Sequence, residues 1–218
     1  MSIREHAVIA CPQCGQEQPF ALWSSVNATL DPEQKERLLA GDLMRSTCDG
    51  CGHTFSVLYP LLYHDMDGMF MIQFAPEGEA EDLADPFINK MTGQYRLRVV
   101  HTRNALLEKI RALAVPLDDR TLEIFKIRME QQIASEAEGE LLFCGTSSDL
   151  DDGVDLHFTW LTAAGTEDYN VPLRSFAEFE LELSEKMRLG PPTVGEWLTI
   201  DRRFAVTALQ AAFGSRPS

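Results

Sequence analysis

The chain has 218 residues, of which 44% are hydrophobic, 24% charged and 9% aromatic. This composition is typical of a globular protein and excludes disordered, collagen-like and low-complexity chains. The 34 acidic residues outnumber the 19 basic ones, and the resulting net charge of −15 repels a nucleic-acid duplex or an anionic membrane, so we expect neither as a partner.

The first half of the sequence alternates short strands with clearly delimited helices. A strand is predicted over His6–Ala10. A helix is predicted between Asp31, an N-cap residue with Gln34 three positions later, and Gly41, which ends it. Further elements follow in chain order: strands over Thr54–Tyr59, Met69–Ala75 and Tyr95–Thr102, a helix with its apolar stripe over Leu106–Ala114, and a helix starting near Asp118.

The second half changes to three strands followed by two helices. The strands are predicted over Glu140–Cys144, Val154–Leu161 and Tyr169–Leu173, and the helices over Arg174–Leu189 and Thr199–Phe213. An acidic stretch at Glu77–Asp85 and a junction at Glu136–Gly139 interrupt the pattern. We therefore expect an α+β fold with two domains: a metal-stapled first domain over residues 5–134, containing a mixed antiparallel sheet and helices, and a smaller α+β domain over residues 139–218.

Four of the five cysteines form two pairs with the same spacing, Cys11-Pro12-Gln13-Cys14-Gly15 and Cys48-Asp49-Gly50-Cys51-Gly52. Two intervening residues let both sulfurs of a tight turn face one ion, and the glycine adopts the backbone conformation that the turn needs. Cys11, Cys14, Cys48 and Cys51 together supply the four ligands of a tetrahedral zinc ion, one per chain. Two independent dithiols are the alternative, and rubredoxin-type iron is the rival metal.

Four thiolates leave no open position for water, so the predicted site is structural. The long segment between the pairs makes this a zinc-ribbon-like element with a helical insert. Met1–His6 shows no export signal, and the longest apolar stretches are shorter than the ~20 residues that span a bilayer. We expect a cytoplasmic protein whose cysteines are thiols or metal ligands.

Two histidines lie in suggestive positions. His64 stands beside a carboxylate in Tyr63-His64-Asp65, but neighbours on a strand point to opposite faces, so we interpret the pair as structural or turn-capping rather than catalytic. His53 follows the second cysteine pair and is surplus to a four-cysteine site.

Other polar positions have structural interpretations. Cys144 lies in an apolar run that predicts a buried strand. Arg96 and Arg98 form a small basic patch suited to protecting an edge strand. His157 projects opposite an apolar strand face and is expected to be exposed. The acidic segment Asp149–Asp155 lacks the register of a calcium loop and is interpreted as a solvated turn.

The chain resembles the CpXC domain family, which occurs in bacteria and archaea and is named for its paired Cys-Pro-x-Cys motifs. The resemblance extends over about residues 8–134 and rests on the two cysteine pairs, the helix from Asp31-Pro32 to Gly41, Pro60–Asp65 and Asn104–Ile110. Asp49 stands where the second motif has proline. The resemblance implies metal binding by Cys11, Cys14, Cys48 and Cys51, and it implies no reaction.

The leading functional hypothesis is a zinc protein whose closed site supports a surface for a protein partner. No phosphate-binding loop, serine-hydrolase elbow or metalloprotease motif is present in the sequence, so it favours no enzyme class. An enzyme with a site away from the cysteines, for example around His64, is one alternative. A rubredoxin-like iron redox protein is the other, and the sequence indicates no oligomeric state.

Overall fold

The computed structural model of the chain describes residues 2–76, 93–133, 138–149 and 153–214. The chain forms two compact units: unit 1 comprises Met1–Leu107 and Val194–Leu198, and unit 2 comprises Glu108–Thr193 and Thr199–Ser218. Helices and strands of both parallel and antiparallel pairing are present, which confirms the predicted α+β class. The acidic stretch Glu77–Asp85 and residues 136–137 of the predicted junction at residues 136–139 lie outside the described residues.

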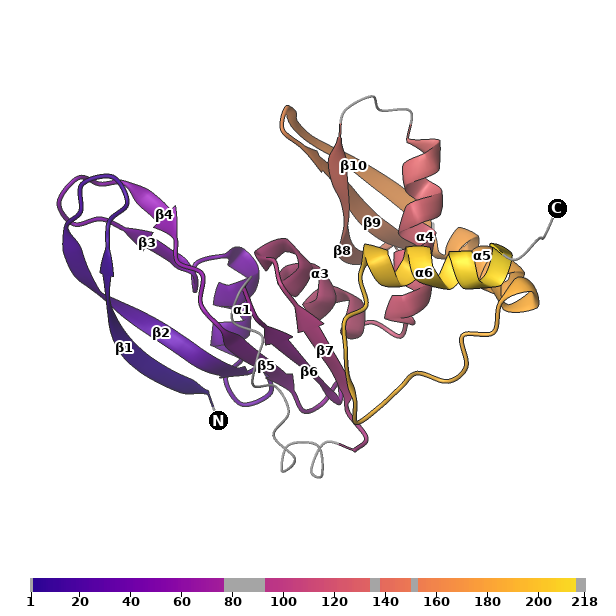
Figure 1. Cartoon of the computed structure of the whole chain (residues 1–218), viewed down its shortest axis with the longest axis horizontal. Coiled ribbons are helices and arrows are strands. Elements are labelled where there is room, and N and C mark those ends of the chain that lie inside the picture. The colour runs from indigo at the N-terminus through magenta and orange to yellow at the C-terminus, as the bar shows by residue number, and fades with distance from the viewer. Residues whose placement is uncertain (1, 77–92, 134–137, 150–152, 215–218) are drawn as a thin grey trace. The chain divides into compact units, whose positions relative to one another are not determined.

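Unit 1 is built on a six-stranded mixed sheet with the order β1-β2-β5-β6-β7-β11, and Figure 1 labels its strands from β1 to β7. β1–β2 and β5–β6 pair antiparallel, whereas β2–β5, β6–β7 and β7–β11 pair parallel. The strands are β1 (Ile3–Ala10), β2 (Glu17–Asn27), β5 (Leu61–Asp65), β6 (Phe70–Phe74), β7 (Arg96–Val100) and β11 (Trp197–Leu198).

The central strands carry the core of this unit. Tyr63, Phe70, Ile72, Phe74 and Leu97 are all fully buried. β7 lies between β6 and β11, so it is not an edge strand. The predicted role of Arg96 and Arg98 in protecting an edge strand is therefore wrong. Arg98 is fully buried and donates from Nη1 to the carbonyl of Leu97 at 2.9 Å.

The helix predicted after Asp31 is α1 (Pro32–Ala40). Gly41 ends it in the left-handed conformation with φ of 81°, a value that favours glycine, and its N–H bonds back into the last turn. Asp31 does not cap the helix with its side chain, because its carboxylate accepts a hydrogen bond from the backbone N–H of Ser2 at 3.1 Å.

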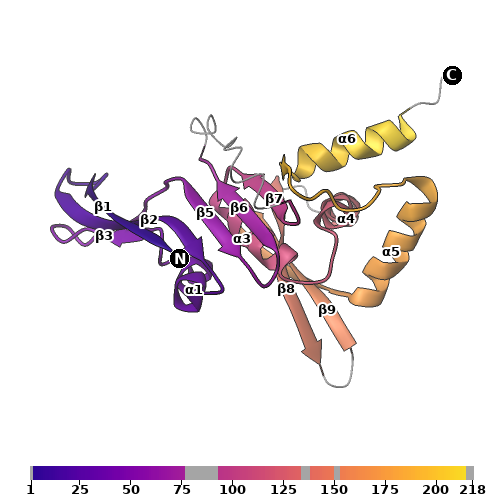
Figure 2. The same ribbon diagram turned by 90° about the horizontal axis from the view of Figure 1, so that it is seen from below.

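Unit 2 contains an antiparallel sheet of β8 (Gly139–Asp149), β9 (Gly153–Thr162) and β10 (Gly165–Pro172), in the order β10-β9-β8. One face of this sheet is covered by α4 (Asp119–Gln132) and α5 (Leu173–Lys186) (Figure 2). α6 (Arg202–Phe213) packs on α4, and α3 (Arg103–Leu113) runs across the boundary between the units.

The core of unit 2 joins the helices to this sheet. Aromatic rings dominate it, with Phe125 of α4 lying 5.1 to 6.0 Å from the rings of Phe158, Phe176 and Phe179. Because α4 shares this core with β8 and β9, the compact units divide the chain at Leu107–Glu108 and not near residues 134–139. The expected division had assigned α4 to the first domain.

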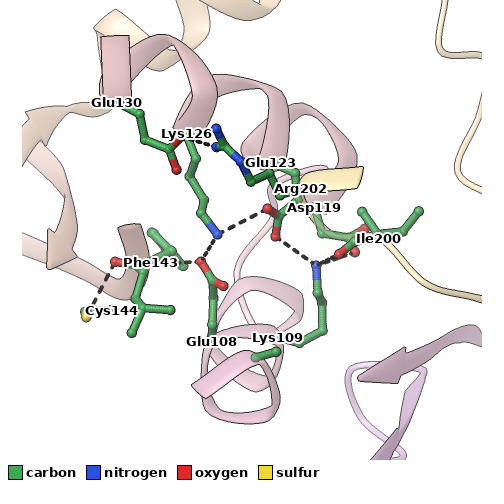
Figure 3. Close-up of polar contacts among 12 residues, drawn as sticks. Glu108, Lys109, Asp119, Glu123, Lys126, Glu130, Phe143, Cys144, Ile200 and Arg202 are labelled. Carbon is green, nitrogen blue, oxygen red and sulfur yellow. Dashed lines mark hydrogen bonds and ion pairs between the residues drawn. The ribbon is translucent and has the colours of Figure 1, made fainter. Parts of the chain in front are cut away.

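Unit 2 also contains a cluster of five buried charged side chains, which we call the buried charge cluster (Figure 3). It consists of Glu108, Lys109, Asp119, Glu123 and Lys126. Lys126 Nζ contacts Glu108 at 2.7 Å and Glu123 at 3.1 Å. Lys109 Nζ contacts Asp119 at 3.2 Å and Glu123 at 3.4 Å. Glu123 therefore joins two lysines that belong to different helices.

Backbone groups complete the hydrogen bonds of the buried charge cluster. Glu108 Oε1 accepts from the N–H of Phe143 in β8 at 2.8 Å, and Lys109 donates to the carbonyl of Ile200 at 2.9 Å. Three carboxylates share two ammonium groups. Burial, opposed by Lys126 and reinforced by Glu123, raises the pKa of Glu108 above its usual range.

Candidate metal centre

Each cysteine pair forms the turn of a hairpin. Residues 11–16 connect β1 to β2, and residues 48–53 connect β3 (Arg45–Thr47) to β4 (Thr54–Ser56). The two turns have matching backbone hydrogen bonds: Cys11 N–H donates to the carbonyl of Gln16 at 2.9 Å, and Cys48 N–H donates to that of His53 at 2.8 Å. The repeated sequence pattern therefore folds into a repeated local structure.

The glycine after each pair closes its turn. Gly15 and Gly52 have φ of +76° and +73°, in the left-handed region that side chains disfavour. Their N–H groups donate to the carbonyls of Cys11 and Cys48, both at 2.9 Å. This tight turn lets the two sulfurs of one pair face the same point, as the spacing predicts.

The two hairpins bring all four sulfurs together. The Sγ atoms of Cys11, Cys14, Cys48 and Cys51 lie within 4.8 Å of one another. Across the two turns, Cys11 Sγ lies 3.7 Å from Cys51 Sγ and Cys14 Sγ lies 3.5 Å from Cys48 Sγ. An ion with metal–sulfur bonds of about 2.3 Å in a tetrahedron separates its ligands by about 3.8 Å. The cluster thus has the size and donor set of a four-thiolate metal site.

Backbone amides lower the pKa of one thiol in this cluster. The N–H groups of Cys51 and Gly50 approach Cys48 Sγ and, against the effect of burial, lower the pKa of this thiol to about 7. Cys11 and Cys48 are buried, whereas Cys14 and Cys51 are exposed at the outer side of the turns. The backbone therefore stabilises the thiolate form of Cys48 relative to an ordinary cysteine.

Gln18 connects the two hairpins, and sequence analysis did not find it. Its buried side-chain amide donates to Ser46 Oγ at 2.8 Å and to the carbonyl of Thr47 at 3.0 Å. Its Oε1 accepts from the N–H of Asp49, inside the second turn, at 3.0 Å. A residue at the start of β2 therefore holds the backbone of both strand β3 and the second cysteine turn.

The comparison with protein families agrees with this geometry. The family described as "CpXC protein" matches residues 9–126, more than half of the 218-residue chain. The chain belongs to the CpXC family. The matched CpXC region contains both cysteine turns and Gln18, and it extends into α4 of unit 2. No curated protein and no solved structure matches the chain.

Neither His53 nor His64 belongs to the cysteine cluster of this CpXC chain. His53 stacks on Phe55 with ring centroids 6.1 Å apart. His64 lies on β5, where Asn27 Nδ2 is 3.4 Å from its Nδ1 and Tyr95 packs on its ring. Burial lowers the pKa of His64, which favours a neutral imidazole.

The carboxylate next to His64 faces elsewhere. Asp65 Oδ1 accepts from the N–H of Gly68 at 2.8 Å, and Oδ2 lies 3.5 Å from Lys35 Nζ. This hydrogen bond caps the turn that begins at Asp65. The interpretation as a turn cap is therefore confirmed for Asp65, and the structure brings no His64–Asp65 pair together.

Cys144 departs from its prediction as a buried residue. β8 has a bulge between Phe143 and Gly145, and the additional residue, Cys144, is exposed. Its sulfur lies 3.3 Å from Thr159 Oγ1 on the outer face of the sheet.

Among the described residues, no helix combines the length and the apolar character needed to cross a bilayer.

Proposed function

We propose that this CpXC protein holds one structural zinc ion per chain at Cys11, Cys14, Cys48 and Cys51, and that the resulting zinc ribbon supports a surface for a protein partner. The observation that carries the proposal is the approach of four sulfurs to within 4.8 Å of one another. Four thiolates fill a tetrahedral ion, whereas catalytic zinc keeps one position for water. Thiolate ligands persist in a reducing compartment, so the proposed location is the cytoplasm.

Metal analysis tests the identity of the ion. The full chain, purified without added metal, should contain one zinc per chain by inductively coupled plasma mass spectrometry and have no visible colour. Iron at one per chain, with visible absorption that bleaches on reduction, would replace the proposal with a rubredoxin-like redox protein. A metal-free chain that also fails to bind added zinc would reject both.

Substitution of one ligand tests the structural role. Cys14→Ser should lower both the zinc content and the thermal stability, because the binding free energy of a structural zinc, about 10–16 kcal/mol in small domains, is also folding free energy. Cys144→Ser is the matched control, since Cys144 is exposed and lies outside the cluster. If Cys14→Ser melts like the wild type, the ion is not structural.

The proposed partner surface is the outer edge of β1. β1 is the terminal strand of the six-stranded sheet, so this edge has no neighbouring strand in the described part of the chain. Its exposed apolar side chains are Val8 and Ile3, which are 70% and 51% accessible. An extended segment of a partner can pair with such an edge through main-chain hydrogen bonds, and the net charge of −15 favours a basic segment.

A pair of matched substitutions tests this surface. Val8→Lys should abolish capture of the partner by the immobilised chain, because it places a positive charge against the proposed basic segment. Leu181→Lys should not, because Leu181 is similarly exposed, at 65%, but lies on α5 of unit 2. Equal capture by the two variants, or no specific capture by the wild type, would remove the proposal for this edge.

A further inference from the structure

The outer face of the sheet in unit 2 carries a row of polar side chains. Along β9, Leu156, Phe158 and Trp160 are buried in the core, whereas His157 and Thr159 project from the opposite face. Ser147 of β8 and Asn170 of β10 flank His157, and both are exposed. Asn170 stands directly opposite His157 in the antiparallel register.

The three side chains form one continuous hydrogen-bonded set. His157 Nε2 lies 2.6 Å from Ser147 Oγ, and His157 Nδ1 lies 2.6 Å from Asn170 Oδ1. A carbonyl oxygen can only accept, so Asn170 fixes the proton of the neutral imidazole on Nδ1. Nε2 is then the unprotonated nitrogen, and it accepts the hydroxyl hydrogen of Ser147.

We propose that Ser147, His157 and Asn170 are a nucleophile, its general base and the residue that positions this base, and that they make Ser147 reactive toward small activated carboxylic esters. The arrangement meets the geometric criteria for an activated serine: nucleophile and base are within hydrogen-bond reach, and a third group orients the base. We name these residues the Ser147 triad. It lies entirely in unit 2, so it is independent of the metal centre and of the proposed β1 surface.

The proposed reaction is an acyl transfer in two steps. Ser147 Oγ attacks the carbonyl carbon, its proton passes to His157 Nε2, and the bond to the alcohol oxygen breaks while His157 returns the proton to that oxygen. Water then attacks the acyl-Ser147 ester by the same route, which releases the carboxylic acid and restores the hydroxyl. Asn170 stays in contact with Nδ1–H throughout and touches no reacting atom.

A neighbouring hydroxyl on the same face shows why Ser147 is singled out. Thr159 Oγ1 donates its hydrogen to Asp168 Oδ1 at 2.7 Å. The acceptor for Thr159 is a carboxylate, whereas the acceptor for Ser147 is an imidazole. Because Thr159 has no imidazole to take its proton, we expect it to be inert. The exposed Cys144 lies on the same face, with its sulfur 3.3 Å from Thr159 Oγ1, and its thiol would compete with Ser147 for an electrophile.

The test is covalent labelling of the full chain with a fluorophosphonate probe in a Cys144→Ala background, with peptide mapping by mass spectrometry. Labelling should occur at Ser147, with loss of fluoride, and p-nitrophenyl acetate should be hydrolysed. Ser147→Ala should abolish both activities. His157→Ala should lower the labelling rate by about 10²-fold or more, the usual contribution of a general base.

Two further variants separate positioning from structure. Asn170→Ala should slow labelling, and Asn170→Asp should restore it, because aspartate keeps an acceptor for Nδ1–H. Ser184→Ala is the matched control, since the Ser184 hydroxyl donates to the carbonyl of Leu181 and not to a histidine. Circular dichroism confirms folding of each variant. Absence of labelling at Ser147, or labelling that survives His157→Ala in a folded chain, overturns the proposal.

Discussion

Gln18 illustrates how one buried side chain supports a metal centre without touching the ion. Gln18→Leu keeps most of the volume but leaves the N–H of Asp49 and the carbonyl of Thr47 without this partner. We expect a loss of about 1–3 kcal/mol in the free energy of unfolding, because buried polar groups lose a hydrogen bond. Metal content should stay at the wild-type value, since every ligand is retained. Urea unfolding and metal analysis measure the two effects.

The control for Gln18 is a glutamine on the surface of the same unit. Gln34 accepts an exposed hydrogen bond from Arg37, so Gln34→Leu should change the free energy of unfolding by less than about 0.5 kcal/mol. Equal effects of the two substitutions would show that Gln18 does not hold the hairpins together.

Residues were predictable where their role is set by neighbours in sequence. The cysteine turns and Gly41 follow from spacing and backbone conformation within a few residues, and the structure brings the four cysteines together as expected. Gln18, Arg98 and Cys144 depend on strand pairing and on a bulge, which arise from tertiary contacts. No local pattern identifies them.

Among the elements, α3 and α4 are joined by buried charges, and Lys126 is the lysine with the closest acidic contact. Lys126→Met removes the ammonium group and leaves Glu108 and Glu123 buried with one fewer cation. We expect a loss of about 3–5 kcal/mol in the free energy of unfolding, as for other broken buried pairs. Denaturant titration measures it.

The exposed pair Arg128–Glu182 provides the comparison within the same helix, because its side chains are 46% and 54% accessible. Arg128→Met should cost less than about 1 kcal/mol, because solvent screens exposed ion pairs. If Lys126→Met costs no more than Arg128→Met, the buried charge cluster contributes little to stability.

Glu108 gives the cluster a pH dependence of known sign. Burial raises the pKa of Glu108 in the folded chain above the ordinary glutamate pKa of 4.5. Above pH 4.5 the unfolded chain loses this proton, whereas the folded chain still keeps it. The contribution of Glu108 to the free energy of unfolding is therefore fully present at low pH and decreases as pH rises from 4.5 through the raised pKa. Glu108→Gln removes this proton equilibrium while keeping an acceptor for Phe143 N–H.

Urea titrations from pH 4 to pH 8 isolate this contribution as the difference between the wild type and Glu108→Gln. The wild type should lose stability relative to the variant as pH increases. A difference that is constant with pH, or that grows in favour of the wild type, would contradict a raised pKa.

The elements most visible in the sequence were those with a strong apolar period. The predicted helices correspond to α1, α3, α4, α5 and α6, and the last three predicted strands correspond to β8, β9 and β10. β2, β3, β5 and β11 were missed, and β3 has only three residues. β2 has mixed side chains in a hairpin arm, β5 follows Pro60 directly, and β11 has two residues that gain strand structure by pairing with β7.

For the whole molecule, packing rather than composition determines how the chain divides. The sequence placed the boundary at a polar junction near residues 136–139, but α4 precedes this junction and shares a core with β8 and β9. Residues 194–198 belong to unit 1 although they follow most of unit 2 in sequence. A late segment that packs on an earlier unit does so through long-range contacts, which the amino-acid composition of the segment does not indicate.

This division predicts how the molecule responds to loss of its metal. The four proposed ligands all lie in unit 1, at the turns of β1–β2 and β3–β4, whereas the aromatic core around Phe125 and Phe158 lies in unit 2. Chelation by EDTA should therefore increase amide hydrogen exchange over residues 3–27 and 45–56, where the ion supplies folding free energy. Exchange over β8, β9 and α4 should stay at its wild-type rate.

Hydrogen–deuterium exchange with mass spectrometry, before and after chelation, resolves these segments in the full chain. Readdition of zinc should restore protection of the hairpins, which separates metal loss from irreversible unfolding. Simultaneous loss of protection in both units would show that they unfold as one cooperative body. Unchanged exchange at the hairpins after verified metal removal would show that the ion does not stabilise them, because the remaining contacts, including those of Gln18, would then be sufficient.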